Sequence, residues 1–324
     1  MADVDVPAAA AALRGRLLRT PLLSSETLGR AFAGRVFLKA ELLQKTGSFK
    51  PRGVLTKLGS LSPDERARGV IAASAGNHAA ALAWGCAVEG IDCLVVMWRG
   101  ASPLKRAAAL GYGAAVDEAA SGPGDVFERL AELQQETGRV LVHPFDDPLV
   151  IAGQGTVGLE ILVEAPEVEA VVVPTGGGGL AAGIASALPG RRVVAVEPEG
   201  SAALHAALEA GRPVAVEARS LADGLNAPFA GEHVVRICRE REVESVLVTE
   251  EEIAAGFRFL YERAKLAVEP AGAAGVAALL GGKIEAVSGA MIAVVVSGGN
   301  VAPKTASDIL KRSDLLTDED RDPS

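Results

Sequence analysis

Apolar residues in this chain gather in short, almost continuous runs, and many of these runs are followed by stretches with a helical spacing of apolar positions. The runs are rich in Val, Ile and Leu and predict strands at 35–43, 69–74, 92–98, 139–144, 170–175, 191–198, 245–249 and 290–299. The other stretches predict helices at 78–90, 102–113, 124–138, 179–190 and 251–265. Apolar strands that alternate with helices are typical of parallel sheets covered by helices on both faces, so we expect an α/β fold.

Composition narrows the class of protein. The 324 residues are 49% hydrophobic but only 4% aromatic, which predicts a core of Ala, Val, Leu and Ile in a chain long enough for two compact lobes. A net charge of −9 argues against nucleic acid or an anionic membrane as a partner. The apolar runs are too short to span a bilayer, and residues 1–16 lack the basic start of a signal peptide.

The cysteines indicate a reducing compartment. Cys86, Cys93 and Cys238 stand in apolar stretches and have no metal-binding spacing. Buried thiols of this kind are common in intracellular proteins and do not form a disulfide framework. We therefore expect a cytoplasmic protein.

A lysine follows the first predicted strand. In open α/β sheets ligands bind at the carboxyl ends of strands, and the segment KTGSFKPRG (45–53) places Lys50 just past such an end. Partial burial would lower the pKa of Lys50 toward that of a nucleophilic amine. From these nine residues alone, a lysine that extends to solvent from the start of a helix is an equal alternative.

Four consecutive glycines follow the strand predicted at 170–175. Gly176–Gly179 lead into a helix, so their backbone can approach a ligand closely and the helix N-terminus favours an anion such as phosphate. No Gly-Lys-Ser/Thr follows, which excludes a nucleoside-triphosphate P-loop. Glu197 ends the next strand about twenty residues on, so a nicotinamide-binding oxidoreductase is an alternative. A structural turn is a third interpretation.

Two further strand ends carry polar groups. Ser74 and Asn77 lie between a strand and a helix, where they could cap the helix or bind a carboxylate through backbone amides. We expect His78 to be structural. Ser297 ends the last predicted strand, and its hydroxyl could face a flat ligand or simply begin a turn.

Taken together, these motifs resemble one family. SFKPRG, SAGNH, PTGGGGL and SGGN occur in the order of the fold type II pyridoxal-phosphate enzymes, the tryptophan-synthase-β type. HPFDDPLVIAGQGTVGLEIL, VAVEPEG, LADG and VEPAGAA resemble the serine/threonine dehydratase branch, which also contains serine racemases. The resemblance covers roughly residues 15–305. It implies pyridoxal 5'-phosphate as the cofactor, a homodimer, and two lobes of mainly parallel sheet with the active site between them.

The resemblance also implies a role for each motif. Lys50 would bind the cofactor aldehyde and remove the substrate α-proton, and Phe49 would pack on the pyridine ring. Asn77 would bond the phenolic oxygen, and Ser297 would face the pyridine nitrogen, where a hydroxyl leaves the ring neutral and favours elimination over transamination. The cofactor phosphate would be held by Gly176, Gly177, Gly178 and Gly179. The substrate would contact Ser74, Ala75, Gly76 and Asn77.

The expected activity is an ammonia-lyase (dehydratase) reaction that converts L-threonine, L-serine or a related 3-hydroxyamino acid into a 2-oxo acid and ammonia. Phe145 and Asn226 are candidates for setting the size of the substrate pocket. Racemases of this branch carry a serine where Ala75 stands, so a serine racemase-like enzyme is the alternative within the fold. A non-catalytic homologue that binds the cofactor is a further alternative.

Metal-dependent members of the branch place a second carboxylate six residues after the glutamate of the VEP segment. Here Glu197 is followed at that spacing by Ala203, so we expect no divalent-cation site. The last predicted strand ends near residue 300, and we expect no C-terminal regulatory domain.

The resemblance suggests how the chain divides into lobes. The predicted large lobe comprises residues 1–53 and 147–312, and the predicted small lobe comprises residues 54–146. The segment HPFDDPLV (143–150), dense in Pro and Asp, is the predicted hinge, and residues 313–324 are predicted to be a disordered tail.

Overall fold

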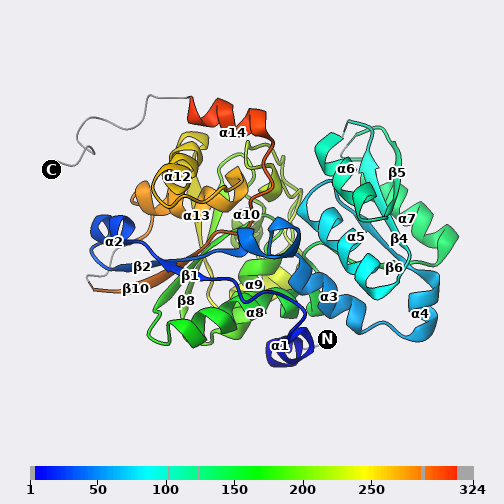
Figure 1. Cartoon of the computed structure of the whole chain (residues 1–324), viewed down its shortest axis with the longest axis horizontal. Coiled ribbons are helices and arrows are strands. Elements are labelled where there is room, and N and C mark those ends of the chain that lie inside the picture. Colours follow the sequence, from blue (N-terminus) through cyan, green and yellow to red (C-terminus); the bar gives the residue numbers. More distant parts are fainter. Residues whose placement is uncertain (1–3, 101–102, 123, 286–288, 312–324) are drawn as a thin grey trace.

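The chain folds around two separate sheets (Figure 1). The computed structural model describes residues 4–100, 103–122, 124–285 and 289–311. The larger sheet has the order β1-β2-β10-β7-β8-β9, with β1 Leu22–Ser24, β2 Arg35–Lys39, β7 Ala170–Pro174, β8 Arg192–Pro198, β9 Glu244–Val248 and β10 Met291–Val295. The smaller sheet has the order β5-β4-β3-β6, with β3 Val70–Ala73, β4 Cys93–Trp98, β5 Ala115–Ala120 and β6 Val140–Leu141.

The sheets are parallel except at one edge, which confirms the α/β class. Each of the eight predicted strands overlaps an observed one, and among the described strands only β1 is antiparallel to its neighbour β2. The pattern missed β1 and β5. β1 has three residues, and β5 has the sequence AVDEAA, whose alanines and acids are depleted in strands.

The strand predicted at 35–43 is too long and needs correction. β2 ends at Lys39, and the chain continues as two short 3-10 turns, η1 Glu41–Leu43 and η2 Lys45–Gly47. The turn is stabilised by a buried ion pair, because Arg52 donates to both carboxylate oxygens of Glu41 at 2.8 and 2.7 Å. Arg52 and Glu41 are eleven positions apart in the chain. The hydrophobic pattern of residues 35–43 contains no sign of this contact, so the pattern predicted too long a strand.

Helices cover both faces of the larger sheet. The five predicted helices are observed as α5 Asn77–Glu89, α6 Pro103–Gly111, α7 Val126–Thr137, α9 Gly179–Ala187 and α12 Glu250–Glu262. The others are α1 Val6–Leu13, α2 Glu26–Phe32, α3 Pro51–Gly59, α4 Pro63–Arg68, α8 Pro148–Glu164, α10 Ala203–Ala210, α11 Glu232–Glu240, α13 Pro270–Leu280 and α14 Pro303–Leu310, with the 3-10 turn η3 Asp223–Leu225. Helix α13 (PAGAAGVAALL) has no polar face, so its sequence carries no helical periodicity.

The core alternates along the central strands. Val171 and Val173 of β7 join an apolar cluster with α8 and α9, whereas Val172 joins the cluster that contains α12 and α13. Successive side chains of a strand point to opposite faces, so the two helix pairs lie on opposite sides of the larger sheet, as Figure 1 shows. The near absence of polar groups on either face explains why these strands read as continuous apolar runs.

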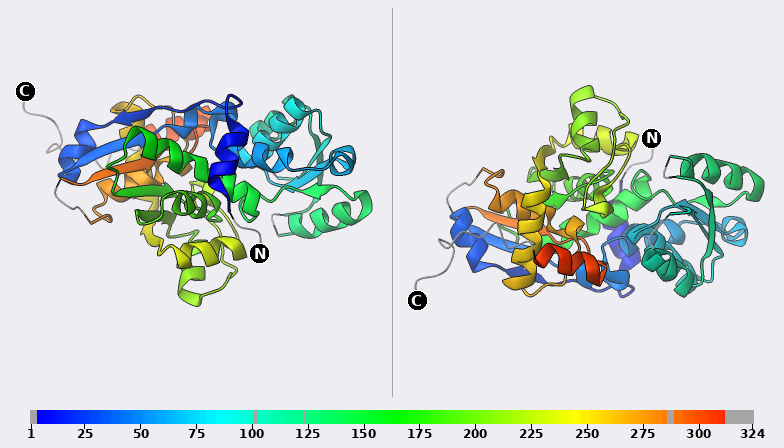
Figure 2. Two further views of the ribbon diagram at one scale, coloured as in Figure 1. Left: turned by 90° about the horizontal axis from the view of Figure 1, so that it is seen from below. Right: turned by 90° about the horizontal axis from the view of Figure 1, so that it is seen from above.

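The two sheets form distinct halves of the molecule. In Figures 1 and 2 the elements between α4 and α7 gather at one end, and the elements of the larger sheet gather at the other. All strands of the smaller sheet lie between residues 70 and 141, inside the segment 54–146. The lobe boundaries and the hinge at 143–150 stay predictions, and the predicted tail at 313–324 lies outside the described residues.

Two further expectations concern the state of the cysteines and membrane-spanning segments. Cys86, Cys93 and Cys238 are buried and free, as their apolar context predicts. Among the described residues, no helix combines the length and the apolar character that crossing a membrane requires.

Candidate active site

Lys50 stands where two distant segments meet. Thr46 and Gly47 both adopt left-handed backbone angles (φ 60° and 74°), which turns the chain sharply after β2. The amide of Phe49 then donates to the carbonyl of Ser297 at 3.2 Å, just past the end of β10. Lys50 follows as the residue that precedes Pro51, the first residue of α3. The end of β10 therefore positions the lysine.

The amine of Lys50 is directed into the protein. Its Nζ donates to the carbonyl oxygen of Pro144 at 2.7 Å and lies 5.1 Å from the centre of the Phe49 ring. Burial lowers the pKa of Lys50 to about 8, and the negative charge of Glu269 only partly opposes this. A lysine that extends to solvent from the helix start is thus the wrong interpretation. A substantial fraction of this amine is neutral, and hence nucleophilic, near pH 8.

This pKa predicts how the cofactor-free protein reacts with aldehydes. The rate at which it forms a visible absorption band with pyridoxal phosphate should rise about tenfold per pH unit below pH 8, because only the neutral amine attacks. Above that pH the rate should level off. Stopped-flow absorbance between pH 6 and 10 measures this dependence. An inflection near the ordinary lysine value of 10.5 would contradict it.

The glycine run forms a tight cradle between β7 and α9. Gly178 has φ 86°, a left-handed value that favours glycine. A Cβ on Gly176 would lie 2.9 Å from the carbonyl oxygen of Leu225, and one on Gly179 would lie 2.6 Å from that of Phe145. A Cβ on Gly177 would overlap the Phe145 ring. The loop therefore requires glycine at all four positions, and it leads into the free amides of the α9 N-terminus.

A hydrogen-bonded chain of side chains holds Asn77. The Asn77 amide group donates to Glu269 Oε1 at 2.6 Å, and its oxygen accepts from Asn300 Nδ2 at 2.8 Å. A side-chain amide has two N–H donors, so Asn77 retains one for a further acceptor. Burial raises the pKa of Glu269 to about 7.

Sequence reasoning missed Glu269 as a member of the site. It lies directly before Pro270 at the start of α13, in the VEPAGAA segment that was used only to recognise the family. Its Oε1 atom lies so close to Gly298 that a Cβ there would overlap it. A glutamate just before a helix-starting proline, at a buried position, was the available signal.

The Ser74–Asn77 loop connects β3 to α5. Ser74 Oγ accepts from the amide of Gly76 at 3.3 Å, and Gly76 immediately precedes the helix. Ala75 packs against the apolar core of the smaller sheet. His78 is buried and its Nε2 bonds the carbonyl of Val142 at 2.9 Å, while burial lowers its pKa to about 3. These contacts support a structural role for His78.

Three further candidates from the sequence are Ser297, Asn226 and Phe145. Ser297 is only 4% exposed and its backbone bonds Phe49. Asn226 donates from Nδ2 to the carbonyl of Ser220 at 3.1 Å, and its Oδ1 is buried without a hydrogen-bond partner among the described residues. Phe145 links the lysine side to the glycine cradle, because it follows Pro144 in the chain and contacts Gly177 and Gly179.

Glu197 is occupied by structural hydrogen bonds. Its two carboxylate oxygens accept from the amides of Leu204 and His205 at 2.7 and 2.8 Å, and Ser245 Oγ donates to one of them at 3.2 Å. The carboxylate thus caps α10, and burial raises its pKa to about 7. No group of three His, Cys, Asp or Glu side chains suited to a metal occurs in the described part of the chain.

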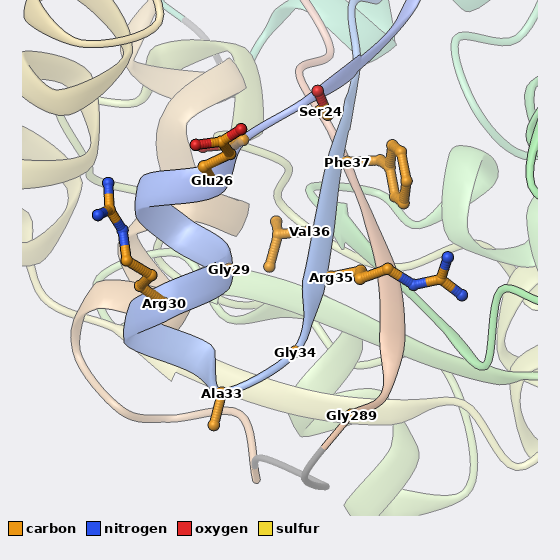
Figure 3. A pocket seen from close by; sticks show the side chains of 11 residues that line it. Ser24, Glu26, Gly29, Arg30, Ala33, Gly34, Arg35, Val36, Phe37 and Gly289 are labelled. Carbon is orange, nitrogen blue, oxygen red and sulfur yellow. The ribbon is translucent and has the colours of Figure 1, made fainter.

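A pocket of about 590 Å³ lies away from these residues, between α2 and β2 (Figure 3). Arg30 and Arg35 line it, but Figure 3 shows their guanidinium groups pointing to opposite sides. Arg35 is paired with Glu167 at 2.8 Å. These charges do not converge on one ligand.

The fold and the site define a class of enzyme. A two-sheet α/β protein with an inward-directed lysine of lowered pKa, a glycine cradle at a helix N-terminus and a side-chain amide held by hydrogen bonds is suited to an aldehyde cofactor that carries a phosphate. The family described as "Pyridoxal-phosphate dependent enzyme" matches residues 13–298. The chain belongs to this family.

The most similar relatives include two bacterial enzymes. The chain is 43% identical over 302 residues to an L-threonine ammonia-lyase of Thermotoga maritima, across 92% of this chain and 75% of that one. It is 40% identical over 311 residues to a catabolic L-threonine dehydratase of Escherichia coli K12, across 94% of both chains.

Solved structures agree with this relationship. The T.th. threonine deaminase superposes with a TM-score of 0.85 at 42% identity, over 92% of this chain and 98% of that one. The maize serine racemase gives a TM-score of 0.89 at 34% identity, over 95% of this chain and 96% of that one.

The residues present fit pyridoxal phosphate. The cradle of Gly176–Gly179, which side chains would fill, suits the phosphate. The inward-directed amine of Lys50 suits the aldehyde, and the free N–H of Asn77 suits the phenolic oxygen. The same test fails for a divalent cation at Glu197, because backbone amides occupy both of its oxygens and Ala203 supplies no second carboxylate.

Proposed function

We propose that this protein is a pyridoxal-phosphate-dependent ammonia-lyase that removes water from L-threonine or L-serine and releases a 2-oxo acid and ammonia. The observation that carries the proposal is the Lys50 amine, directed inward with a pKa near 8, in a chain 40–43% identical to threonine ammonia-lyases and dehydratases. The nicotinamide-binding alternative is unsupported. Glu197, its key residue, caps α10 instead of facing a ligand.

The chain's own residues have distinct tasks in this reaction. Bound pyridoxal phosphate supplies an electron sink for the electrons of the broken Cα–H bond. Lys50 accepts the α-proton as a neutral amine, which its lowered pKa favours. Glu269 and Asn300 orient Asn77, and the loop that begins at Ser74 offers amides to the substrate carboxylate.

A substrate panel tests the proposal. The purified protein should be yellow and should form a 2-oxo acid and ammonia in equal amounts from L-threonine, L-serine or a bulkier 3-hydroxyamino acid. A coloured protein that releases ammonia from none of these would be a non-catalytic homologue. A colourless protein that binds a nicotinamide dinucleotide would overturn the proposal.

We further propose that the protein is a cytoplasmic homodimer that needs no divalent cation. Three buried free cysteines support the compartment, the capping role of Glu197 supports metal independence, and family resemblance supports the dimer. Sedimentation of the cofactor-loaded protein measures the oligomeric state, and a monomer would contradict it.

Ala75 predicts little racemisation. With L-serine, the protein should form pyruvate and almost no D-serine, because a methyl group cannot deliver a proton to the face of the α-carbon opposite Lys50. Ala75→Ser should introduce measurable D-serine, whereas Ala75→Gly, which also lacks a hydroxyl, should not. Chiral chromatography measures both products. D-serine that accumulates in the wild type as fast as pyruvate would favour the racemase alternative.

A further inference from the structure

An ion pair joins the two halves of the molecule beside the site. Lys105 Nζ, on α6 of the smaller-sheet half, pairs with Asp223 Oδ2 in η3 of the larger-sheet half. The two side chains are 26% and 57% exposed, so the pair lies at the surface and the ammonium is its more enclosed member. Asp223 belongs to the LADG segment, which so far has no task in the reaction.

The ammonium of Lys105 lies over the loop assigned to the substrate carboxylate. Its Nζ is 4.0 Å from the position that a Cβ on Gly76 would occupy. Gly76 precedes α5, whose first amides have no partner within the helix. The charges of Lys105 and Asp223 also shift the pKa of Glu269 in opposite directions, which places both near the Asn77–Glu269 pair.

We propose that Lys105 recognises the α-carboxylate of the substrate and that Asp223 is a positioning residue that holds the ammonium over Gly76. The inference rests on the proposed function and deepens it. In a protein with a net charge of −9, a local positive charge strengthens the binding of a carboxylate, because helix amides carry only partial charges. An ammonium has three donors, so Lys105 can bond a substrate carboxylate while it retains Asp223.

The experiment compares Lys105→Gln with the wild type on two substrates, L-threonine and L-threoninamide, which lacks the negative charge. For L-threonine, KM should rise about tenfold with kcat nearly unchanged, since a charge-assisted hydrogen bond to the carboxylate is lost. For L-threoninamide, kcat/KM should not change. Lys304→Gln, which removes an equal charge from an 84% exposed side chain, should alter neither substrate. Lys105→Arg should recover part of the loss.

A purely structural role of Lys105 predicts different results. If Lys105→Gln lowers kcat/KM equally for both substrates, Lys105 only holds the two halves of the molecule together and the inference is wrong. The charge-reversed pair Lys105→Asp with Asp223→Lys separates the two roles. If Lys105 binds the carboxylate, the double variant should keep the high KM for L-threonine. If only the ion pair between the two halves is needed, the double variant should have a normal KM.

A second readout keeps this test independent of turnover. If the wild type released no ammonia, the proposed function would have failed. The change in visible absorption of the cofactor-loaded protein on adding L-threonine or L-threoninamide would then report binding. A loss confined to L-threonine in Lys105→Gln would still support the inference, and an equal loss for both would overturn it.

Discussion

Lys50→Ala is expected to abolish turnover, by a factor of at least about 10³, together with the visible absorption band of the cofactor. The side chain supplies the only atom in the proposed reaction that both bonds the aldehyde and accepts the α-proton. Its tertiary contacts include one hydrogen bond, to the carbonyl of Pro144, so its removal should change the free energy of unfolding by less than about 1.5 kcal/mol.

The measurements are ammonia release, the absorption spectrum and thermal unfolding of the cofactor-free protein. Lys45→Ala is the matched control, because Lys45 is an exposed lysine on the same turn, and this variant should keep both activity and colour. Elimination at more than a trace rate in Lys50→Ala would refute Lys50 as the base. A large loss of stability would leave its catalytic role unproven in this variant, and Lys50→Arg, which keeps the charge, would then decide.

Gly177→Ala is expected to weaken the binding of pyridoxal phosphate about 10- to 100-fold. The added methyl group would overlap the ring of Phe145, which is buried and held edge-on by His143 at 4.6 Å between ring centres. The ring contacts Phe229 as well, at 5.7 Å, so it has little room to move. The glycine cradle must shift instead, and the amides at the start of α9 move with it.

A double variant tests this reason. Phe145→Ala in the Gly177→Ala background should restore most of the affinity, because the ring that the methyl group meets is gone. Gly59→Ala is the matched control, since a Cβ there meets nothing within 4 Å. Absorbance titration of cofactor-free protein measures the affinities. Normal binding by Gly177→Ala alone would show that the cradle is not the phosphate site.

Much of the fold could be predicted because its signals are local. The strands β3, β4, β7, β8 and β10 are short apolar runs, and a run of this kind reports burial on both faces of a sheet. Two other signals are also local. The glycine run indicates backbone freedom, and the lysine after a turn indicates the end of a strand. Helices α8 and α13 could not be predicted well, because they are buried on most sides and lack a polar stripe.

The site depended on contacts that no local pattern contains. Asn77 and Glu269 are 192 residues apart, and Lys105 and Asp223 are 118 residues apart. Each pair joins a residue of the smaller-sheet half to a residue of the larger-sheet half, so it depends on how the two halves pack against each other. Glu197 is an example in which a local pattern suggests a site that the structure does not form. Its spacing fits a dinucleotide or metal site, but its oxygens cap α10.

The sequence by itself determined the α/β class and most strands, because these depend on short-range periodicity. It also marked the glycine run by its backbone freedom, whereas the choice of Lys50 came from the resemblance of the motifs to a family. Only the tertiary structure decided which way the Lys50 amine points, that Glu269 supports Asn77, and that Lys105 lies over Gly76. The physical reason is that burial and electrostatic shifts of pKa depend on neighbours in space. Neighbours in space are set by the packing of the two sheets and their helices.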